Sequence, residues 1–343
     1  MQHAKYHSRV AYQVNRRSKS LACNSNTSDD DFGETVKSMD SAVVGESAAL
    51  FTSLLWTMSS IFFTSATKKI GWLSVNAYRT LMAIGLLAVT HLILLGTLVP
   101  LASSGQWFWM GLSGIVGLGI GDSGLFAAYV TIGPRRSLLL MALAPIFAVL
   151  FAYVLLGETI PELADLGIVI TLIGVVIVIL EAEERSGEAR ISRGQRTMGV
   201  VFGIVAALGQ GVGLALSKKG IDLNPALVLN PISATLIRLL LGALFIWILA
   251  LMSGRLRRVF AAAMDIHGMQ NTAVASVLGP YLGITFSMVA VTFTETGVAQ
   301  TLLSLMPVMI IPVVWVLYRQ RTSWRGILGA IVAVVGVAII FFS

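Results

Sequence analysis

The stretch Gly-Leu-Gly-Ile-Gly-Asp-Ser-Gly at residues 117–124 has a counterpart at residues 279–286, where the chain reads Gly-Pro-Tyr-Leu-Gly-Ile-Thr-Phe. The first and fifth positions of both stretches are glycines that coincide when the chain is shifted by 162 residues. The same shift superimposes three further pairs, which are Pro145 with Pro307, Gly167 with Gly329, and Gly174 with Gly336. The chain therefore contains two copies of one structural unit.

The composition indicates that both copies lie in a membrane. Of the 343 residues, 56% are hydrophobic and only 12% are charged, whereas soluble domains contain roughly 25% charged residues. Apolar runs reach the length of about 20 residues that a membrane-spanning helix needs, and no segments show the alternating polarity of a β-barrel. The predicted fold class is an all-α integral membrane protein, because helices satisfy their own backbone in lipid. We predict about ten transmembrane helices, at residues 47–66, 75–98, 107–130, 136–156, 163–181, 197–217, 229–252, 270–294, 297–318 and 325–342.

The spans divide into two repeats of five helices. The predicted organisation is a polar, disordered N-terminal tail (1–46), a first repeat (47–181), a charged linker (182–196) and a second repeat (197–343). Because five is odd, the repeats must be inverted relative to each other. Loop Lys and Arg residues gather on one face, which the positive-inside rule makes cytoplasmic, and both termini then lie outside. A translation start at Met39 instead of Met1 would shorten the tail.

Several function classes are disfavoured by the sequence. The formal net charge of +7 does not indicate nucleic-acid binding, because the basic residues lie in loops at membrane edges. The single cysteine, Cys23, cannot form an internal disulfide, and the four histidines lack the spacing of a metal site. We find no phosphate-binding loop, nucleophile motif or dinucleotide fingerprint. We therefore predict no enzyme activity, no catalytic residue, no metal and no cofactor.

Asp122 is the leading candidate for a functional residue. A carboxylate well inside a predicted span is costly unless it is paired, protonated or hydrated. It could carry a proton in a coupled cycle or contact a polar substrate; alternatively, it is a structural acid that pairs with Arg79 or accepts backbone N–H groups. Arg79 and Arg238 lie at similar places in the two repeats and could neutralise an anionic substrate, pair with an acid or extend to the interface. Gln210 is an isolated polar residue of the sixth span and a further candidate for binding or coupling.

Hydroxyl groups line one face of the first predicted span. Ser53, Thr57, Ser60 and Thr64 follow helical spacing, so they share a face that could border a polar path. Thr57 and Ser60 are the binding candidates among them. The alternative is that these hydroxyls bond to their own helix backbone.

Pro145 and Pro307 interrupt the fourth and ninth predicted spans at corresponding positions. Proline lacks the N–H group that a helix needs, so each should break its helix. Matching breaks in two halves indicate a substrate site between them, and both prolines are therefore site candidates. A simple kink is the alternative.

At these residues the chain resembles EamA-type members of the drug/metabolite transporter superfamily. The stretches that carry the resemblance are Gly121-Asp122-Ser123, Ser137-Leu138-Leu139, Ala144-Pro145-Ile146-Phe147 and Leu156-Gly157-Glu158, and, in the second repeat, Ala299-Gln300-Thr301-Leu302-Leu303 and Met306-Pro307-Val308. Arg319-Gln320 stands where the first repeat has Gly157-Glu158, and it departs from the usual Gly-Glu or Lys-Glu ending of this span in the family. Only the first repeat therefore supplies the glutamate. The resemblance implies inverted five-helix repeats around a central cavity, and transport of metabolites or drugs, often as export.

We therefore predict a secondary transporter of small organic metabolites or drugs, an exporter that works by alternating access and is coupled to protons. Its partners would be a small-molecule substrate and membrane lipids, with no nucleic acid, in a monomer or homodimer of the plasma membrane. The alternative is a lipid-handling protein, either a scramblase or an enzyme for lipid-linked substrates. A scaffold without transport activity also stays open.

Overall fold

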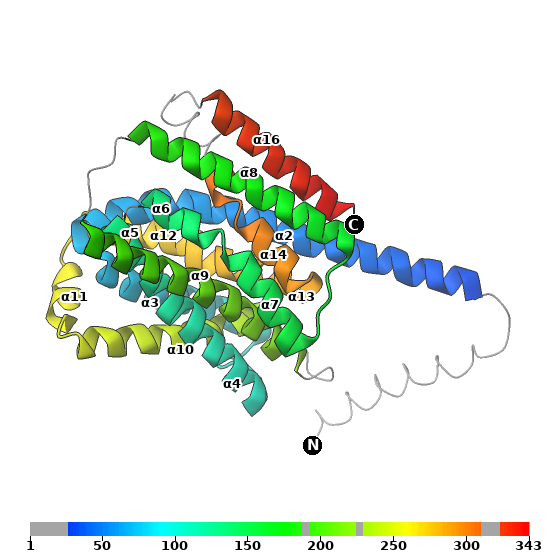
Figure 1. Ribbon diagram of the computed structural model, residues 1–343. Coiled ribbons are helices and arrows are strands. Elements are labelled where there is room, and N and C mark those ends of the chain that lie inside the picture. Colours follow the sequence, from blue (N-terminus) through cyan, green and yellow to red (C-terminus); the bar gives the residue numbers. More distant parts are fainter. Residues whose placement is uncertain (1–26, 133, 187–191, 224–228, 310–322, 343) are drawn as a thin grey trace, which may run out of the picture. The chain divides into compact units, whose positions relative to one another are not determined.

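The computed structural model describes residues 27–132, 134–186, 192–223, 229–309 and 323–342 (Figure 1). The chain divides into two units, Met1–Ser41 and Ala42–Ser343, and the second contains both repeats. In the first unit the described residues, from Thr27 onward, are helical. The predicted tail boundary at residue 46 stays a prediction.

Helices follow one another in the order that the apolar runs predict. In the first half of the chain they are α2 (Thr27–Ile70), α3 (Trp72–Leu95), α4 (Ser104–Ser113), the π-helical segment η1 (Gly114–Gly121), α5 (Asp122–Ile132), α6 (Pro134–Met141), α7 (Ala144–Leu156) and α8 (Glu162–Ser186). In the second half they are α9 (Arg193–Asp222), α10 (Pro231–Met252), α11 (Leu256–Ala262), α12 (Ile266–Ser276), the π-helical segment η2 (Val277–Gly283), α13 (Ile284–Phe293), α14 (Thr296–Leu303) and α16 (Trp324–Phe341).

The all-helical class is confirmed, since the described ranges contain helices and no strand. Within those ranges, seven helical stretches are long and apolar enough to cross a membrane, and two shorter apolar helices, Ala144–Leu156 and Thr296–Met309, accompany them. Each predicted span coincides with at least one helix. The end of the ninth span, beyond Met309, and the departure at Arg319-Gln320 lie outside the described residues.

Both prolines break their helices, and they do so in the same way. Ahead of Pro145, the amide of Leu143 donates to the carbonyl of Leu140 at 3.0 Å; ahead of Pro307, Leu305 donates to Leu302 at 3.2 Å. Each pair forms a tight turn in which an i→i−3 bond replaces the helical pattern. The turns lie 162 residues apart, so the predicted interruptions are present in both repeats.

The third predicted span of each repeat contains a feature that its sequence did not reveal. Segments η1 and η2 are wound as π-helix, and each ends with an i→i−5 bond, from the amide of Asp122 to Gly117 and from the amide of Ile284 to Gly279. π-Helical turns are rare and occur frequently at functional sites. Asp122 and Ile284 are thus equivalent positions, each being the first residue after the π-helical segment.

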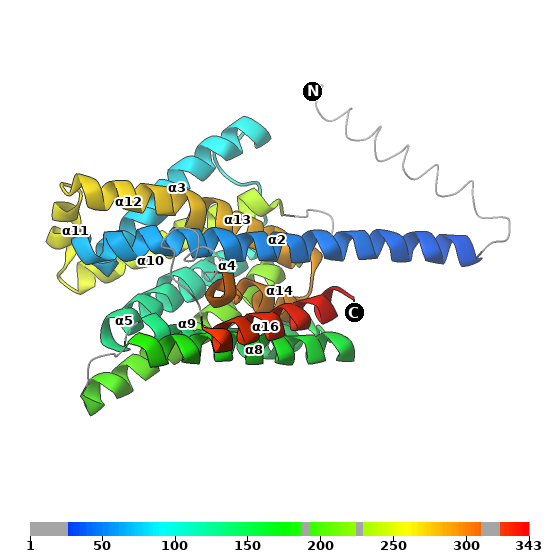
Figure 2. The ribbon, with the colours of Figure 1, turned by 90° about the horizontal axis from the view of Figure 1, so that it is seen from above.

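The last helices of the two repeats, α8 and α16, lie side by side in both ribbon views (Figures 1 and 2). Their contact is made by the glycines that the repeat pairs. A Cβ atom on Gly174 would lie 2.6 Å from the carbonyl oxygen of Gly329, and one on Gly167 would lie 2.9 Å from that of Gly336. Small residues therefore allow the two backbones to approach closely, as in helix pairs within membranes.

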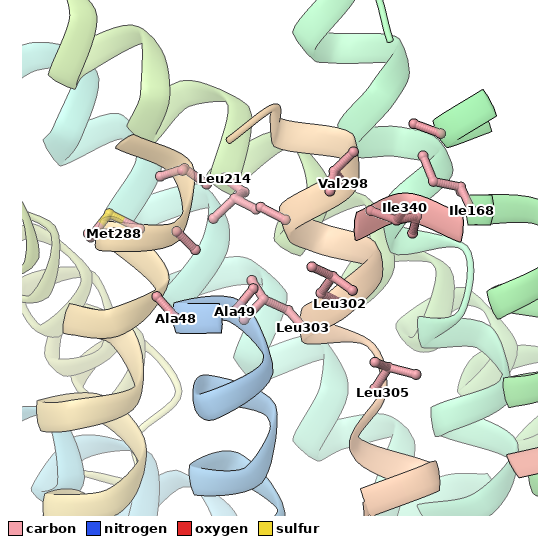
Figure 3. Packing of buried hydrophobic residues seen from close by; sticks show 14 of the residues in the cluster. Ala48, Ala49, Ile168, Leu214, Met288, Val298, Leu302, Leu303, Leu305 and Ile340 are labelled. Atoms are coloured by element: carbon pink, nitrogen blue, oxygen red, sulfur yellow. The ribbon is translucent and has the colours of Figure 1, made fainter. Parts of the chain in front are cut away.

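Helix α14 lies in the centre of the main hydrophobic core (Figure 3). Buried side chains from seven other described helices contribute to this cluster, among them Ala49 of α2, Ile168 of α8, Met288 of α13 and Ile340 of α16, together with Leu302 of α14 itself. Many large apolar side chains elsewhere are exposed, including Ile93 on α3, which is 73% exposed. Such a surface is unusual for a soluble protein and is suited to contact with lipid.

Candidate functional site

Asp122 lies at the junction of η1 and α5, inside the span Ser104–Ile132. The π-helical winding before it leaves the carbonyl of Gly117 to accept the Asp122 amide five residues later. Asp122 as a whole residue is only 8% exposed, so bulk water can compensate little of the carboxylate charge. Its partners must come from the surrounding helices.

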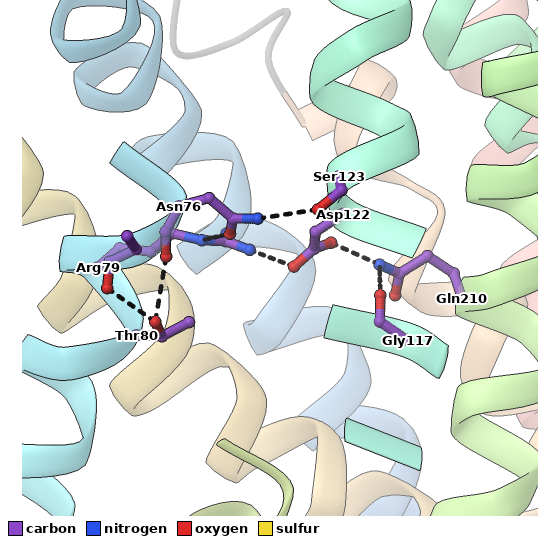
Figure 4. Close-up of polar contacts among 8 residues, drawn as sticks. Asn76, Arg79, Thr80, Gly117, Asp122, Ser123 and Gln210 are labelled. Atoms are coloured by element: carbon purple, nitrogen blue, oxygen red, sulfur yellow. Dashed lines mark hydrogen bonds and ion pairs between the residues drawn. The ribbon is translucent and has the colours of Figure 1, made fainter. Parts of the chain in front are cut away.

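The first partner of Asp122 is Arg79 of α3. Nη2 of Arg79 forms an ion pair with Oδ2 of Asp122, and the two side chains are 10% and 11% exposed (Figure 4). Nε of Arg79 also donates to Oδ1 of Asn76, one turn earlier on α3, at 2.8 Å. The pairing with Arg79, one of the alternatives considered for Asp122, is therefore what the structure shows.

The second partner of Asp122 comes from the other half of the chain. Nε2 of Gln210, on α9, donates to Oδ1 of Asp122 at 2.7 Å and lies 3.4 Å from the carbonyl oxygen of Gly117. Both carboxylate oxygens are thus engaged, one by each half (Figure 4). Ser123 extends the group, since Nδ2 of Asn76 lies 3.5 Å from its hydroxyl. We call Asn76, Arg79, Asp122, Ser123 and Gln210 the Asp122 cluster.

Aromatic rings enclose the arginine of this cluster. The guanidinium of Arg79 lies 5.4 Å from the ring centre of Phe63 and 5.1 Å from that of Phe126, within the range of cation–π attraction. Phe126 in turn contacts Tyr129 edge-to-face, with ring centres 6.1 Å apart. The Arg79 charge is therefore stabilised by one carboxylate, one amide oxygen and two aromatic faces.

Arg238 of α10 lies against the same π-helical segment, η1. A Cβ atom placed on Gly117 would lie 2.7 Å from Nη2 of Arg238, so the guanidinium lies against the η1 backbone. The residue is 3% exposed, its Nε has no hydrogen-bond partner among the described residues, and it is close enough to Asp122 for an electrostatic interaction. Sequence reasoning anticipated a possible extension to the membrane interface, but its burial contradicts that alternative.

The remaining candidates are separate from the Asp122 cluster. The hydroxyl of Thr57 donates to Ser53 of its own helix at 2.8 Å and lies 3.3 Å from the carbonyl of Met306, next to Pro307. Ser60 donates to the carbonyl of Thr57 at 2.7 Å. Backbone bonding, the alternative for this face, thus accounts for both hydroxyls, and whether they contact a substrate stays a prediction.

One contact connects the helix break at Pro145 with the Asp122 cluster. A Cβ atom on Gly211 would lie 2.5 Å from the carbonyl oxygen of Ala144, so the start of α7 packs on α9 beside Gln210. The helix break at Pro145 therefore borders the same stretch of α9 that contacts Asp122. The role of both prolines in substrate binding stays a prediction.

Sequence reasoning missed Asn76, Phe63 and Phe126. Asn76 precedes Arg79 by three residues and shares its helix face, which was a readable signal. The two phenylalanines gave no such signal, because an aromatic residue in an apolar span is ordinary. Only the contact between α2, α3 and α5 reveals their role.

A second polar group lies eight residues further along α9, and we call it the Glu158 cluster. Nζ of Lys218 lies 2.7 Å from Oε1 of Glu158 and donates to the carbonyl of Thr294 at 2.7 Å. Oε2 of Glu158 accepts the backbone amide of Thr296 at 2.9 Å, at the start of α14. A glutamate from the first half thus caps a helix of the second half.

Comparison with known proteins adds a family to this geometry. A family model described as the EamA-like transporter family matches residues 43–180 and again residues 197–342. An uncharacterized transporter of Clostridium kluyveri is 24% identical over 238 residues, which are 68% of this chain and 72% of that protein. A solved structure, described only as a crystal structure of a protein, is also similar to this chain. The match covers 88% of this chain and 96% of the other one, with a TM-score of 0.66 and 17% sequence identity. This last likeness shows the fold alone.

Proposed function

Because the chain belongs to the EamA-like transporter family, we propose that it exports a small organic solute by alternating access of its two repeats. Family membership and the long apolar helices make it an integral membrane transporter built from two repeats. The direction of transport, the solute and the energy source are proposed here and go beyond family membership. So is its location in the plasma membrane, as a monomer or homodimer whose partners are the solute and lipids.

One observation carries the proposal: the buried Asp122 carboxylate is shared between helices of the two repeats. Arg79 holds it from α3 and Gln210 from α9. If the repeats rock against each other, these two contacts cannot both be kept, because they belong to different halves. A site whose contacts change between two states can couple binding to that change.

The proposed role of Asp122 follows from its two partners. A polar group of the solute would replace the Gln210 amide at Oδ1 when α9 moves away. Protonation of Asp122 would release Arg79 and favour one arrangement, which is how a proton gradient would drive the cycle. The charge on Asp122 is costly in a dry interior without Arg79, so proton uptake and loss of the ion pair should occur together.

The experiment uses proteoliposomes that enclose the pH-sensitive dye pyranine. Amino acids, organic acids, nucleosides, sugars and amphipathic drugs are added singly, and the internal pH is followed for wild type, Asp122→Asn and Asp165→Asn. Asp165 is an exposed acid at the start of α8, so its variant is the matched control. We expect one class of solute to change the internal pH with wild type and Asp165→Asn, and Asp122→Asn to lose the change.

Two other results would alter the proposal. Uptake of labelled solute by wild type without any pH change would retain transport and refute proton coupling. Absence of solute movement, together with rapid bleaching of fluorescent lipid in both leaflets by dithionite, would refute the proposal in favour of a lipid scramblase.

A further inference from the structure

Arg238 is a buried cation for which the described part of the chain supplies no hydrogen-bond partner. It lies in the span Pro231–Met252, is 3% exposed, and its Nε is fully buried without an acceptor. No ion pair with a described carboxylate involves it either. An arginine side chain offers five N–H groups, and leaving even the buried Nε–H group without an acceptor is costly. Such a residue requires a functional reason.

Comparison of the two repeats indicates which partner Arg238 lacks. In the first repeat Arg79 pairs with Asp122, the first residue after η1. In the second repeat the position equivalent to Asp122 is Ile284, the first residue after η2. The second repeat therefore keeps the arginine and lacks the acid.

The charges around η1 do not balance. Among the described residues, Arg79 and Arg238 bring two positive charges to the region, and Asp122 brings one negative charge. One monoanion would neutralise the remainder, whereas a phosphate dianion would leave an excess negative charge. A guanidinium takes a carboxylate through two parallel N–H···O bonds, which matches the unused donors of Arg238.

Arg238 lies beside the contact between Gln210 and Asp122, which the proposed function expects to break during transport. Its Nη2 lies against Gly117, whose carbonyl is 3.4 Å from Nε2 of Gln210. Beside this point η1 and α9 pack backbone against backbone, since a Cβ atom on Gly213 would lie 2.8 Å from Cα of Gly117 and one on Gly209 would lie 2.7 Å from Cα of Gly121. A group bound by Arg238 would therefore require η1 and α9 to separate, which is the movement that the proposed function assigns to the two repeats.

We propose that Arg238 binds the carboxylate of a small organic monoanion, which is the solute that this protein transports. This inference rests on the proposed function, because it names the class of solute that the same site would take. Asp122 and Gln210 would then bind polar groups elsewhere on the solute. The described residues leave the arginine unpaired, so that the solute can supply its counter-ion.

The first test compares the two arginines without any ligand. Arg79→Gln removes the partner of Asp122 and should lower the thermal unfolding temperature in detergent. Arg238→Gln removes an uncompensated charge while keeping side-chain length, and its unfolding temperature should equal or exceed that of wild type. A loss of stability in Arg238→Gln as large as in Arg79→Gln would show that Arg238 is a structural partner of Asp122, and would overturn the proposal.

The second test measures ligand-induced stabilisation. Sodium salts of acetate, lactate, benzoate, glutamate and citrate are compared at millimolar concentration with acetamide, lactamide, benzamide and glutamine, at constant chloride. A ligand that binds the folded state raises its unfolding temperature by mass action. We expect at least one monocarboxylate, and not its amide, to stabilise wild type. Arg238→Lys should bind that carboxylate with an apparent affinity at least tenfold lower, and Arg238→Gln should show no stabilisation by it.

The outcomes separate this inference from the proposed function. If wild type and Arg238→Gln transport the same neutral or cationic solute equally well, the transporter proposal holds and the carboxylate site is refuted. If carboxylates stabilise only proteins with Arg238 but no solute crosses the liposome membrane, the site holds and the transport proposal fails. A stabilisation by chloride alone, or no carboxylate effect that depends on Arg238, would also overturn the inference.

Discussion

The ion pair between Glu158 and Lys218 joins the two repeats, and its strength can be predicted from its geometry. Glu158 follows α7, and Lys218 belongs to α9. We consider Glu158→Gln, which keeps an oxygen for the Thr296 amide, and Lys218→Met, which keeps most of the side-chain length. The double variant removes both charges and leaves a neutral contact.

The exposed fractions of the two side chains decide the expected magnitude. They are 14% for Lys218 and 13% for Glu158, so water screens the pair far less than a surface bridge. At the observed separation of 2.7 Å the attraction is about 6 kcal/mol with an effective dielectric constant of 20. Desolvation offsets most of it, and charge-assisted bonds contribute about 1.5–3 kcal/mol net. We therefore expect a coupling energy of about 1.5–3 kcal/mol in the double-mutant cycle.

The assay is unfolding of the purified protein by SDS in mixed micelles, followed by tryptophan fluorescence. Lys219→Met is the matched control. Lys219 is the next residue on α9, but its Nζ donates to a backbone carbonyl, that of Leu155, at 3.0 Å, whereas Lys218 forms the ion pair with Glu158. The cycle of Glu158→Gln with Lys219→Met should be additive. A coupling energy below about 0.5 kcal/mol between Glu158 and Lys218, the range of surface bridges, would refute the reasoning.

Two further predictions concern glycines. Gly174→Ala should destabilise the protein by about 1–3 kcal/mol in the same assay, because its Cβ atom meets the α16 backbone. The control Gly85→Ala, whose Cβ atom would have no described atom within 4 Å, should stabilise the protein by about 0.4–1 kcal/mol. Equal effects of the two substitutions would contradict the packing of α8 on α16. Gly117→Ala should displace Nη2 of Arg238 and weaken the carboxylate-induced stabilisation with little loss of stability in the free protein. Unchanged carboxylate binding would contradict the placement of Arg238.

Much of the fold was readable from the sequence because it rests on two strong signals. Long apolar runs predict spanning helices, and the shift of 162 residues predicts the repeat and the helix breaks at Pro145 and Pro307. The π-helical winding of η1 and η2 could not be predicted, since their glycine-containing sequences are compatible with either helix type. Segment η1 packs against α9 and α10, and η2 packs against α3, and only the tertiary structure reveals these contacts.

The candidate site was readable only in part. Asp122, Arg79 and Gln210 stood out because polar residues in apolar spans are rare, and the structure brings these three together. Their pairing was one of several alternatives, because spacing along the sequence does not determine which helices touch. Arg238 was anticipated as a candidate, but its lack of a partner among the described residues is a property of the assembled bundle. The first-span hydroxyls Thr57 and Ser60 show how a polar face can be largely satisfied by its own helix.

The pairing of α8 with α16 has a consequence for the order of biosynthesis. Helix α8 is complete at Ser186, but its partner begins only at Trp324. At ordinary rates of translation the glycine face of α8 waits on the order of ten seconds for the chain to reach α16. During that interval the first repeat has been synthesised but α16 has not. Assembly of the bundle should therefore depend on membrane-insertion factors, or on another protein that binds the glycine face of α8 until α16 arrives. A nascent chain arrested before Trp324 should therefore be a preferred substrate for membrane proteases.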